Sequence, residues 1–218
     1  NQDIGAWQTG AVTNMGWMFA WAYAFNQDLS AWSIDAVTSM YYMFYLASSF
    51  NQQLCWSIAT RVNIDYMFGS SSGSLDGCQP SPAPTATPLP TFTPRPTFGL
   101  SAPYTFTSKA ELKAATDAWV SDASAAKTTY GHISTWDTSL ITDMSYLFCG
   151  AASASSNNYE CDEAYQSFND DVSAWQTGAV TTMEYTFQYA RNFNQDIGAW
   201  QTSAVTSMYG LSHHADSL

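Results

Sequence analysis

The chain has 218 residues, of which 18 are acidic and 6 are basic, so its formal net charge is −12. This charge argues against nucleic acid and anionic membrane surfaces as partners, because both are bound through basic patches. Aromatic residues make up 16 % of the chain and charged residues only 11 %, which is typical of neither a disordered acidic segment nor an ordinary cytosolic enzyme. No apolar run approaches the roughly 20 residues that a membrane-spanning helix needs, so membrane insertion is not expected.

A short repeat organises the sequence from its first residues. The phrase NQDIGAWQTGAVTNM at residue 1 returns as NQDIGAWQTSAVTSM at residue 194. Each unit predicts an extended segment, a turn, a second extended segment and a short helical or 3₁₀ turn. A unit of this size cannot bury its own apolar face, so the copies must stack with their Trp, Val, Met and Phe residues in the core. Tryptophans mark the copies at intervals of 25 and 24, then after a break 39 and 25: Trp7, Trp32, Trp56, Trp136, Trp175 and Trp200.

Two polar columns accompany the apolar ones. One consists of asparagines and predicts a ladder of hydrogen bonds to turn backbone: Asn1, Asn26, Asn51, Asn169 and Asn194. The other consists of aspartates, which could hold calcium but which Gln53 interrupts, so turn capping is the preferred role: Asp3, Asp28, Asp171 and Asp196. No metal and no other cofactor is predicted.

Residues 1–78 are expected to be the last copies of a repeat array with its C-terminal cap. The cap is a degenerate copy rich in Gly and Ser, and a Cys55–Cys78 disulfide would close it. Residues 79–98 follow as a linker with seven prolines and five threonines, a composition typical of polyproline II. O-glycans are predicted on the threonines of this linker: Thr85, Thr87, Thr91, Thr93 and Thr97.

Residues 99–218 are expected to be an N-terminal cap helix and the first copies of an array. Ser108 and Glu111 form a capping box, and apolar residues follow at helical spacing from Leu112. A second disulfide, Cys149–Cys161, would close an insertion in the first copy. Two disulfides favour an oxidising, extracellular or cell-surface location.

The segments FNQDLSAW at residue 25 and AVTSMYYMFYLA at residue 36 resemble the BspA-type leucine-rich-repeat surface-protein family, over residues 1–78 and 131–218. The resemblance implies a secreted or surface location, adhesion as the usual suggested role, and no catalytic residues. The fold expected from it is an α/β repeat solenoid of leucine-rich-repeat-like stacked rungs, with the N-terminal cap helix and the disulfide-closed C-terminal cap described above.

The repeat also keeps its register across the two ends of the chain. If Leu218 is joined to Asn1, the interval from Trp200 to Trp7 is again 25 residues. The sequence therefore predicts a contact between units made by Asn1, Trp7, Trp200 and Leu218. Either 218 residues are one period of a continuous polymer, or separate chains complete one another end to end. The alternative is a chance piece of a protein with two arrays.

Three functions compete on this basis, and none of them is enzymatic. The first is a non-catalytic structural unit of an extracellular fibre or surface appendage, which assembles head to tail with itself. The second is an adhesin that binds protein or glycan, with sugar stacking on Trp17, Trp21, Tyr41, Tyr42 and Tyr45. The third is ice binding through a threonine column: Thr13, Thr38, Thr142, Thr181 and Thr206. An enzyme is disfavoured because the three histidines have no nucleophile at a recognisable spacing.

Overall fold

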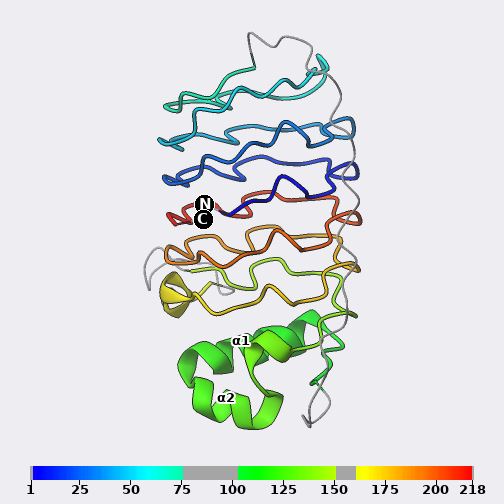
Figure 1. Cartoon of the computed structure of the whole chain (residues 1–218), viewed down its shortest axis with the longest axis vertical. Coiled ribbons are helices and arrows are strands. Elements are labelled where there is room, and N and C mark those ends of the chain that lie inside the picture. The colour runs from blue at the N-terminus through cyan, green and yellow to red at the C-terminus, as the bar shows by residue number, and fades with distance from the viewer. Residues whose placement is uncertain (1, 76–102, 151–160, 218) are drawn as a thin grey trace.

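A computed structural model describes residues 2–75, 103–150 and 161–217. In this part of the chain the regular elements are two α-helices, α1 (Lys109–Ser121) and α2 (Ala123–Tyr130), and two 3₁₀ helices, η1 (Ile133–Thr135) and η2 (Glu163–Ser167). The rest of the described chain winds in flat passes that follow one another along the long axis (Figure 1). Each pass is called a tier below and is named by its turn segment. From the helical end the tiers are 144–150, 183–189, 208–214, 15–21, 40–46 and 64–70.

The expected α/β repeat solenoid with leucine-rich-repeat-like rungs is wrong. The described residues contain no β-strand and no sheet, and neighbouring tiers share only isolated parallel bridges such as Asn14↔Ser39 and Ser39↔Asn63. The physical reason is that a bridged residue is followed at once by a turn, so two consecutive residues never form a ladder. The short helical turn expected after each bridge is also absent in these tiers, where a chain of hydrogen-bonded turns takes its place.

Four backbone hydrogen bonds join each pair of neighbouring turn segments. Between tiers 15–21 and 40–46, the amides of alternate residues donate to carbonyls above them at 2.8–2.9 Å: Met15 to Ser39, Trp17 to Tyr41, Phe19 to Met43 and Trp21 to Tyr45. The donors and acceptors of one tier belong to the same peptide groups, so these groups are aligned along the long axis. Every N–H in the set points away from the helices.

Tier 208–214 lies directly on tier 15–21, although the two are far apart in sequence (Figure 1). The four bonds between them repeat the pattern at 2.9–3.0 Å: Met208 to Asn14, Gly210 to Gly16, Ser212 to Met18 and His214 to Ala20. Residues 103–217 and residues 2–75 therefore form one uninterrupted stack. We call the contact between these two halves the junction.

Tryptophan indoles add a second set of bonds between tiers. Trp32 Nε1 donates to the carbonyl oxygen of Ile4 at 3.0 Å, and Trp200 Nε1 donates to that of Val172 at 3.1 Å. Trp7 does the same across the junction, to Ile197 at 3.1 Å. Most indole and phenylalanine rings of the stack are buried between these bonds, and several stack on their equivalents in the next tier, as Trp7 does on Trp32 and Phe19 on Phe44.

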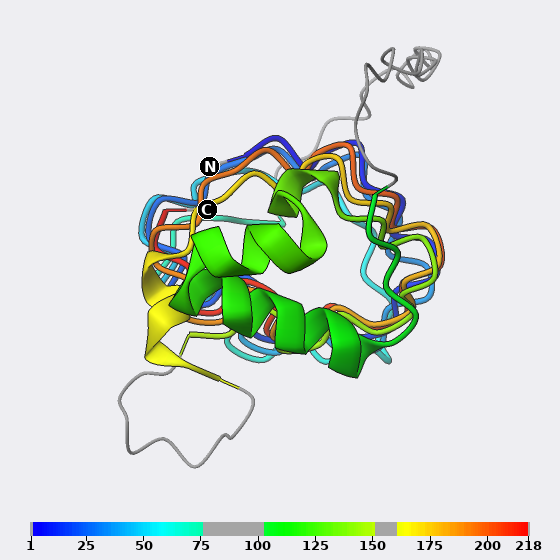
Figure 2. The same ribbon diagram turned by 90° about the horizontal axis from the view of Figure 1, so that it is seen from below.

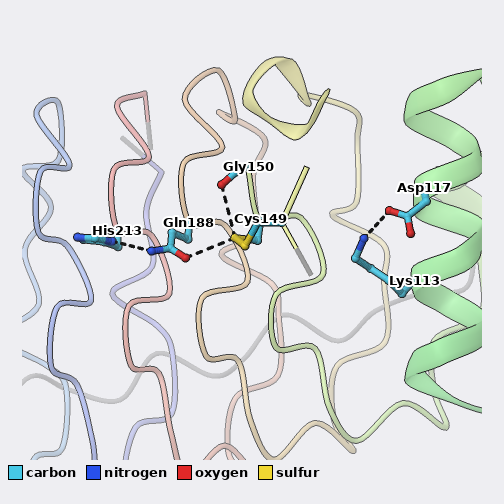
Figure 3. Close-up of a disulfide and its surroundings, with 7 residues drawn as sticks. Lys113, Asp117, Cys149, Gly150, Gln188 and His213 are labelled. Atoms are coloured by element: carbon cyan, nitrogen blue, oxygen red, sulfur yellow. Dashed lines mark hydrogen bonds and ion pairs between the residues drawn. A yellow bond between two sulfur atoms is a disulfide. The ribbon is translucent and has the colours of Figure 1, made fainter. Parts of the chain in front are cut away.

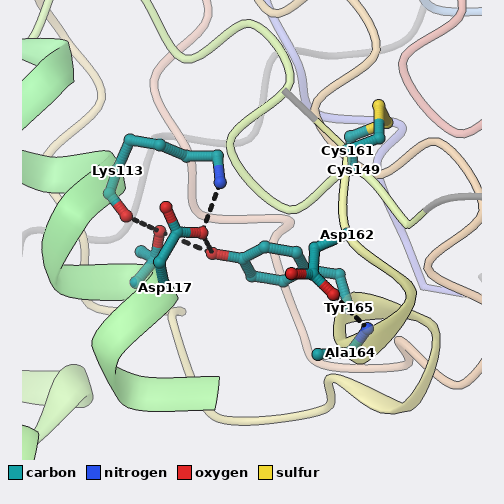
Figure 4. Close-up of polar contacts among 8 residues, drawn as sticks. Lys113, Asp117, Cys149, Cys161, Asp162, Ala164 and Tyr165 are labelled. Atoms are coloured by element: carbon teal, nitrogen blue, oxygen red, sulfur yellow. Dashed lines mark hydrogen bonds and ion pairs between the residues drawn. A yellow bond between two sulfur atoms is a disulfide. The ribbon is translucent and has the colours of Figure 1, made fainter. Parts of the chain in front are cut away.

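Helices α1 and α2 cover one end of the stack (Figure 2). The expected helix start is confirmed, because the Ser108 side chain accepts a hydrogen bond from the Glu111 amide. Figure 4 shows how α1 is tied to the first tier. The Tyr165 hydroxyl on η2 lies 2.8 Å from both Thr116 Oγ1 and Asp117 Oδ1, and the Lys113 ammonium lies over the Tyr165 ring while pairing with Asp117. Burial raises the pKa of the Tyr165 hydroxyl, so it stays a donor.

The indole bonds predict unequal effects of two similar substitutions. Trp200→Phe should lower the free energy of unfolding by about 0.5–1.5 kcal/mol, because the carbonyl of Val172 loses the indole donor and keeps only the Trp175 amide. Trp56→Phe should cost less, since Trp56 Nε1 has no hydrogen-bond partner among the described residues. Urea unfolding of both variants checks this, and equal losses would contradict it.

Candidate functional site

The turn segments contain aromatic residues whose backbone is in the left-handed conformation. Ten non-glycine residues have positive φ angles, between 53° and 60°, and seven of them are aromatic: Trp17, Trp21, Tyr42, Tyr66, Tyr146, Tyr185 and Tyr189. This conformation is uncommon for bulky side chains. Each of the seven is the third residue of an i to i+3 hydrogen-bonded turn, such as Met40–Met43 around Tyr42. Positive φ at the third residue distinguishes these turns from the common type I turn, which has negative φ there, so the turn type that the tiers use imposes an unfavourable conformation on these residues.

The side chains of these residues form two columns of rings along the stack. In the first column, Tyr42 stacks on Trp17 at 4.4 Å and on Tyr66 at 4.9 Å between ring centroids. In the second, His214 stacks on Tyr189 at 4.4 Å and on Trp21 at 4.5 Å. We call them the aromatic columns. Because stacking contributes favourably at each step, the columns offset part of the cost of the left-handed turns.

One position in the first column must be glycine. Gly210 has φ 60°, and a Cβ atom there would lie 2.6 Å from the Tyr185 ring. The neighbouring Tyr209 instead meets Tyr185 edge to face at 5.3 Å. The first column is therefore interrupted on the 103–217 side of the junction.

The rings inside the columns are engaged with one another. The faces of Trp17, Trp21 and Tyr42 lie against other rings. Tyr41 and Tyr45 stand edge to face against the same cluster and are half-buried. These contacts disfavour sugar stacking on the predicted residues.

The junction encloses a pair of histidines. His213 Nδ1 lies 3.0 Å from Gln188 Nε2, and Gln188 Oε1 in turn lies 3.4 Å from Cys149 Sγ (Figure 3). Gln188 donates to Nδ1, so the imidazole carries its proton on Nε2. That Nε2 is buried without a hydrogen-bond partner. The His213 ring lies edge to face against Trp17 and Trp21, with ring centroids 5.5 and 5.1 Å apart.

Both histidines are neutral in the folded protein at neutral pH. Burial lowers the pKa of His213 to about 3, with a further contribution from His214. Burial also lowers the pKa of His214 to about 4, and the nearby Arg191 adds to the effect. The acidic group nearest to Arg191 is Asp216, whose carboxylate lies 3.9 Å from the Arg191 Nε. The two imidazoles are packed between aromatic rings at the junction.

The structure places the predicted contact residues Trp7 and Trp200 in adjacent tiers of one chain, on the two sides of the junction. Asn1 and Leu218 lie outside the described residues. The expected Cys149–Cys161 disulfide is present. Cys55 is disulfide-bonded, but Cys78 lies outside the described residues. The linker 79–98 and its predicted glycosylation sites lie outside them too: Thr85, Thr87, Thr91, Thr93 and Thr97.

The polar columns have structural roles. Asn26 Oδ1 accepts from the Asn51 amide and Asn169 Oδ1 from the Asn194 amide, which confirms the asparagine ladder. Aspartates of the other column cap turns, as Asp28 does for the Ser30 amide. Threonine hydroxyls such as that of Thr38 donate to carbonyls of the neighbouring tier, so they are engaged rather than presented to ice. Within the described residues there is no cluster of three or more His, Cys, Asp or Glu that could hold a metal.

The histidine pair was not found by sequence reasoning, although a signal existed. Trp7 and Trp200 fix an offset of 193 residues between equivalent positions. The same offset places His214 on Trp21 and His213 on Ala20. Applied to the divergent copy at residues 208–217, the register alone would have placed the His214 imidazole on Trp21 of the other half and His213 beside it.

Comparison with known proteins gives a family. The model of the family described as "Mycoplasma protein of unknown function, DUF285" matches residues 1–76 and 117–218. The chain belongs to this family. No match was found among curated proteins or among solved structures. No helix in the described ranges is long and apolar enough to cross a membrane.

The histidine pair predicts loss of stability in mild acid. Because the folded-state pKa values lie below the unfolded value near 6.5, the unfolded chain binds protons first as the pH falls. The free energy of unfolding should therefore decrease from pH 6.5 to 4.5, by up to about 1.4 kcal/mol per pH unit for each imidazole. His214→Phe, which keeps a flat ring, should reduce this slope, whereas His132→Asn at an exposed position should not. Urea unfolding at several pH values measures the slope, and a flat profile would refute the assignment.

Proposed function

We propose that the protein is a non-catalytic structural unit of an extracellular fibre or surface appendage, and that units join head to tail by exchanging halves across the junction. The observation that carries this proposal is the similarity of the junction to the other contacts between tiers. The same four backbone bonds, the indole bond of Trp7 and one stacked ring column, through His214 and Trp21, occur there as within one half. Nothing in these contacts requires both halves to come from one molecule.

The connection between the halves also suits exchange. Residues 71–75 belong to the tier farthest from the helices, where Ser74 bridges Gln53, and residues 103–106 lie near the helices, where Thr105 bridges Asp137. Residues 76–102 therefore join opposite ends of the stack when both halves belong to one molecule. In an exchanged assembly the same residues would join one stack to the next. Exchange of identical elements forms no new type of contact. The equilibrium between single molecules and exchanged assemblies therefore depends on the linker and on protein concentration.

An extracellular or cell-surface location is part of the proposal. The Cys149–Cys161 disulfide supports it, since disulfides persist mainly in oxidising compartments. The BspA-like pattern of the repeat supports it as well, and we propose that this family is related to the BspA-type surface proteins. The same proposal includes O-glycans on the threonines of residues 79–98. It also includes no nucleic-acid partner, because the net charge is −12.

Cysteines placed across the junction distinguish exchange from a closed single molecule. Gln8 and Gln201 are exposed residues at equivalent positions of adjacent tiers, next to Trp7 and Trp200. In concentrated Gln8→Cys/Gln201→Cys protein, exchange predicts disulfide-linked dimers and longer species in non-reducing electrophoresis. The control Gln176→Cys/Gln201→Cys places both cysteines in one half and should give only monomers. Monomers from both variants, in material that electron microscopy shows to be dispersed, would rule out the fibre.

An adhesin is the second candidate, supported by the half-exposed edges of the tyrosine cluster at Tyr41, Tyr42 and Tyr45. Because the ring faces are engaged, binding would use hydroxyl groups rather than stacking. Tyr41→Phe/Tyr45→Phe should then abolish binding to a glycan or protein array without changing the unfolding midpoint. Binding unchanged by this pair would exclude the tyrosine edge as the adhesive surface.

A further inference from the structure

The end of the stack opposite the helices carries a row of unpaired backbone donors. In the five inner tiers, the four outward amides of each turn segment donate to the carbonyls of the next tier. The last turn segment, 64–70, has the same four amides, those of Ile64, Tyr66, Phe68 and Ser70. Among the described residues no acceptor faces any of them. Ile64, Tyr66 and Ser70 are exposed and Phe68 is half-buried.

Two ring columns end at the same face. Tyr66 is the last ring of the Trp17–Tyr42–Tyr66 column, has Tyr42 as its ring partner, and is 64 % exposed. Phe68 is the last ring of the column that contains Phe44, at 5.6 Å. Inside the stack, the next tier always covers both the amides and the rings. Among residues 2–75, 103–150 and 161–217 nothing covers this end face, which is one half of an interface that these residues form five times.

The face has one polarity. Aligned peptide groups place their positive N–H ends here and their carbonyl ends toward the helices, as in a helix dipole. Two such turn segments cannot pair with each other, because both offer only donors; the bonds of opposite sense, such as that from the Asn63 amide to the Thr38 carbonyl, lie just before the turn segments. The complementary surface must present carbonyl oxygens on alternate residues, together with flat rings two residues apart.

We propose that the 64–70 face docks a segment of a second polypeptide that has the pattern of the repeat itself, with aromatic residues two positions apart and backbone carbonyls directed at the four free amides. The occupant follows from continuity with the established interface: it must supply what Asp65, Met67 and their neighbours supply to tier 40–46. The mode is strand-like augmentation, in which main-chain bonds give affinity and side-chain positions give specificity. The proposal goes beyond exchange at the junction and stands without it.

Amide hydrogen exchange measured by NMR tests the proposal on the whole chain. The probe is a synthetic peptide of residues 10–25 with two lysines added for solubility, because this segment carries the carbonyl row that the chain itself uses. In the free protein, the amides of Ile64, Tyr66, Phe68 and Ser70 should exchange without protection, while those of tier 40–46 are protected. Saturating peptide should slow the four amides at least tenfold. A scrambled peptide should leave them unchanged.

Two exposed apolar residues give matched variants. Ile64→Lys places a charged side chain on the edge, a common protection against strand addition, and should weaken peptide binding at least tenfold. Leu140→Lys changes an exposed leucine in another tier and should bind as the parent does; the two side chains are 38 % and 57 % exposed. Tyr66→Ala keeps the donor but removes the ring, so it should weaken binding while the amides remain protected by bound peptide. Protection of the four amides in the free protein, peptide protection elsewhere, or equal binding by both lysine variants would overturn the proposal. None of these outcomes depends on the cysteine experiment at the junction.

Discussion

The alignment of peptide groups along the stack is the interaction on which this structure depends. Each turn segment places four N–H groups on one side and four carbonyls on the other, and the tiers bond through these rows without any β-strand. The alignment needs left-handed residues at fixed positions of each turn, and the chain uses Trp and Tyr there more often than Gly. A bulky residue in this conformation is locally unfavourable. Stacking between equivalent rings opposes that cost, so the ring columns and the peptide rows depend on each other.

The sequence predicts the side-chain columns better than the backbone that carries them. Repeat spacing alone aligns Trp7 with Trp32, Asn26 with Asn51 and Thr13 with Thr38, and these pairs lie in contact between tiers. The capping box at Ser108 likewise predicts α1, because capping is local chemistry. The strands were wrongly expected because apolar alternation does not reveal a left-handed turn. Tyr42 has no local preference for positive φ, and its conformation follows from Trp17 and Tyr66 in other tiers.

Polarity explains why the two ends of the stack are built differently. The carbonyl end meets α1, η2 and the first tier, where Tyr165, Thr116 and Asp117 form a compact polar contact (Figure 4). The helices cover that end of the stack (Figure 2). The donor end has no comparable helix among the described residues, and its rings are partly uncovered. The two ends of the described stack therefore differ both in polarity and in what covers them.

The junction has the same bonds as the contacts within each half, and this similarity determines how the halves can separate. In a stack where each tier contacts only its neighbours, stability is approximately a sum over tiers and interfaces. Separating the halves then breaks one interface and leaves the others intact, so exchange between molecules does not require global unfolding. His213 and His214 distinguish this interface from the rest, because they bring titratable rings against Trp17 and Trp21. Residues 2–75 contain no histidine, so an acid effect carried by imidazoles would act on the contact whose loss separates the halves and not on the interfaces within residues 2–75.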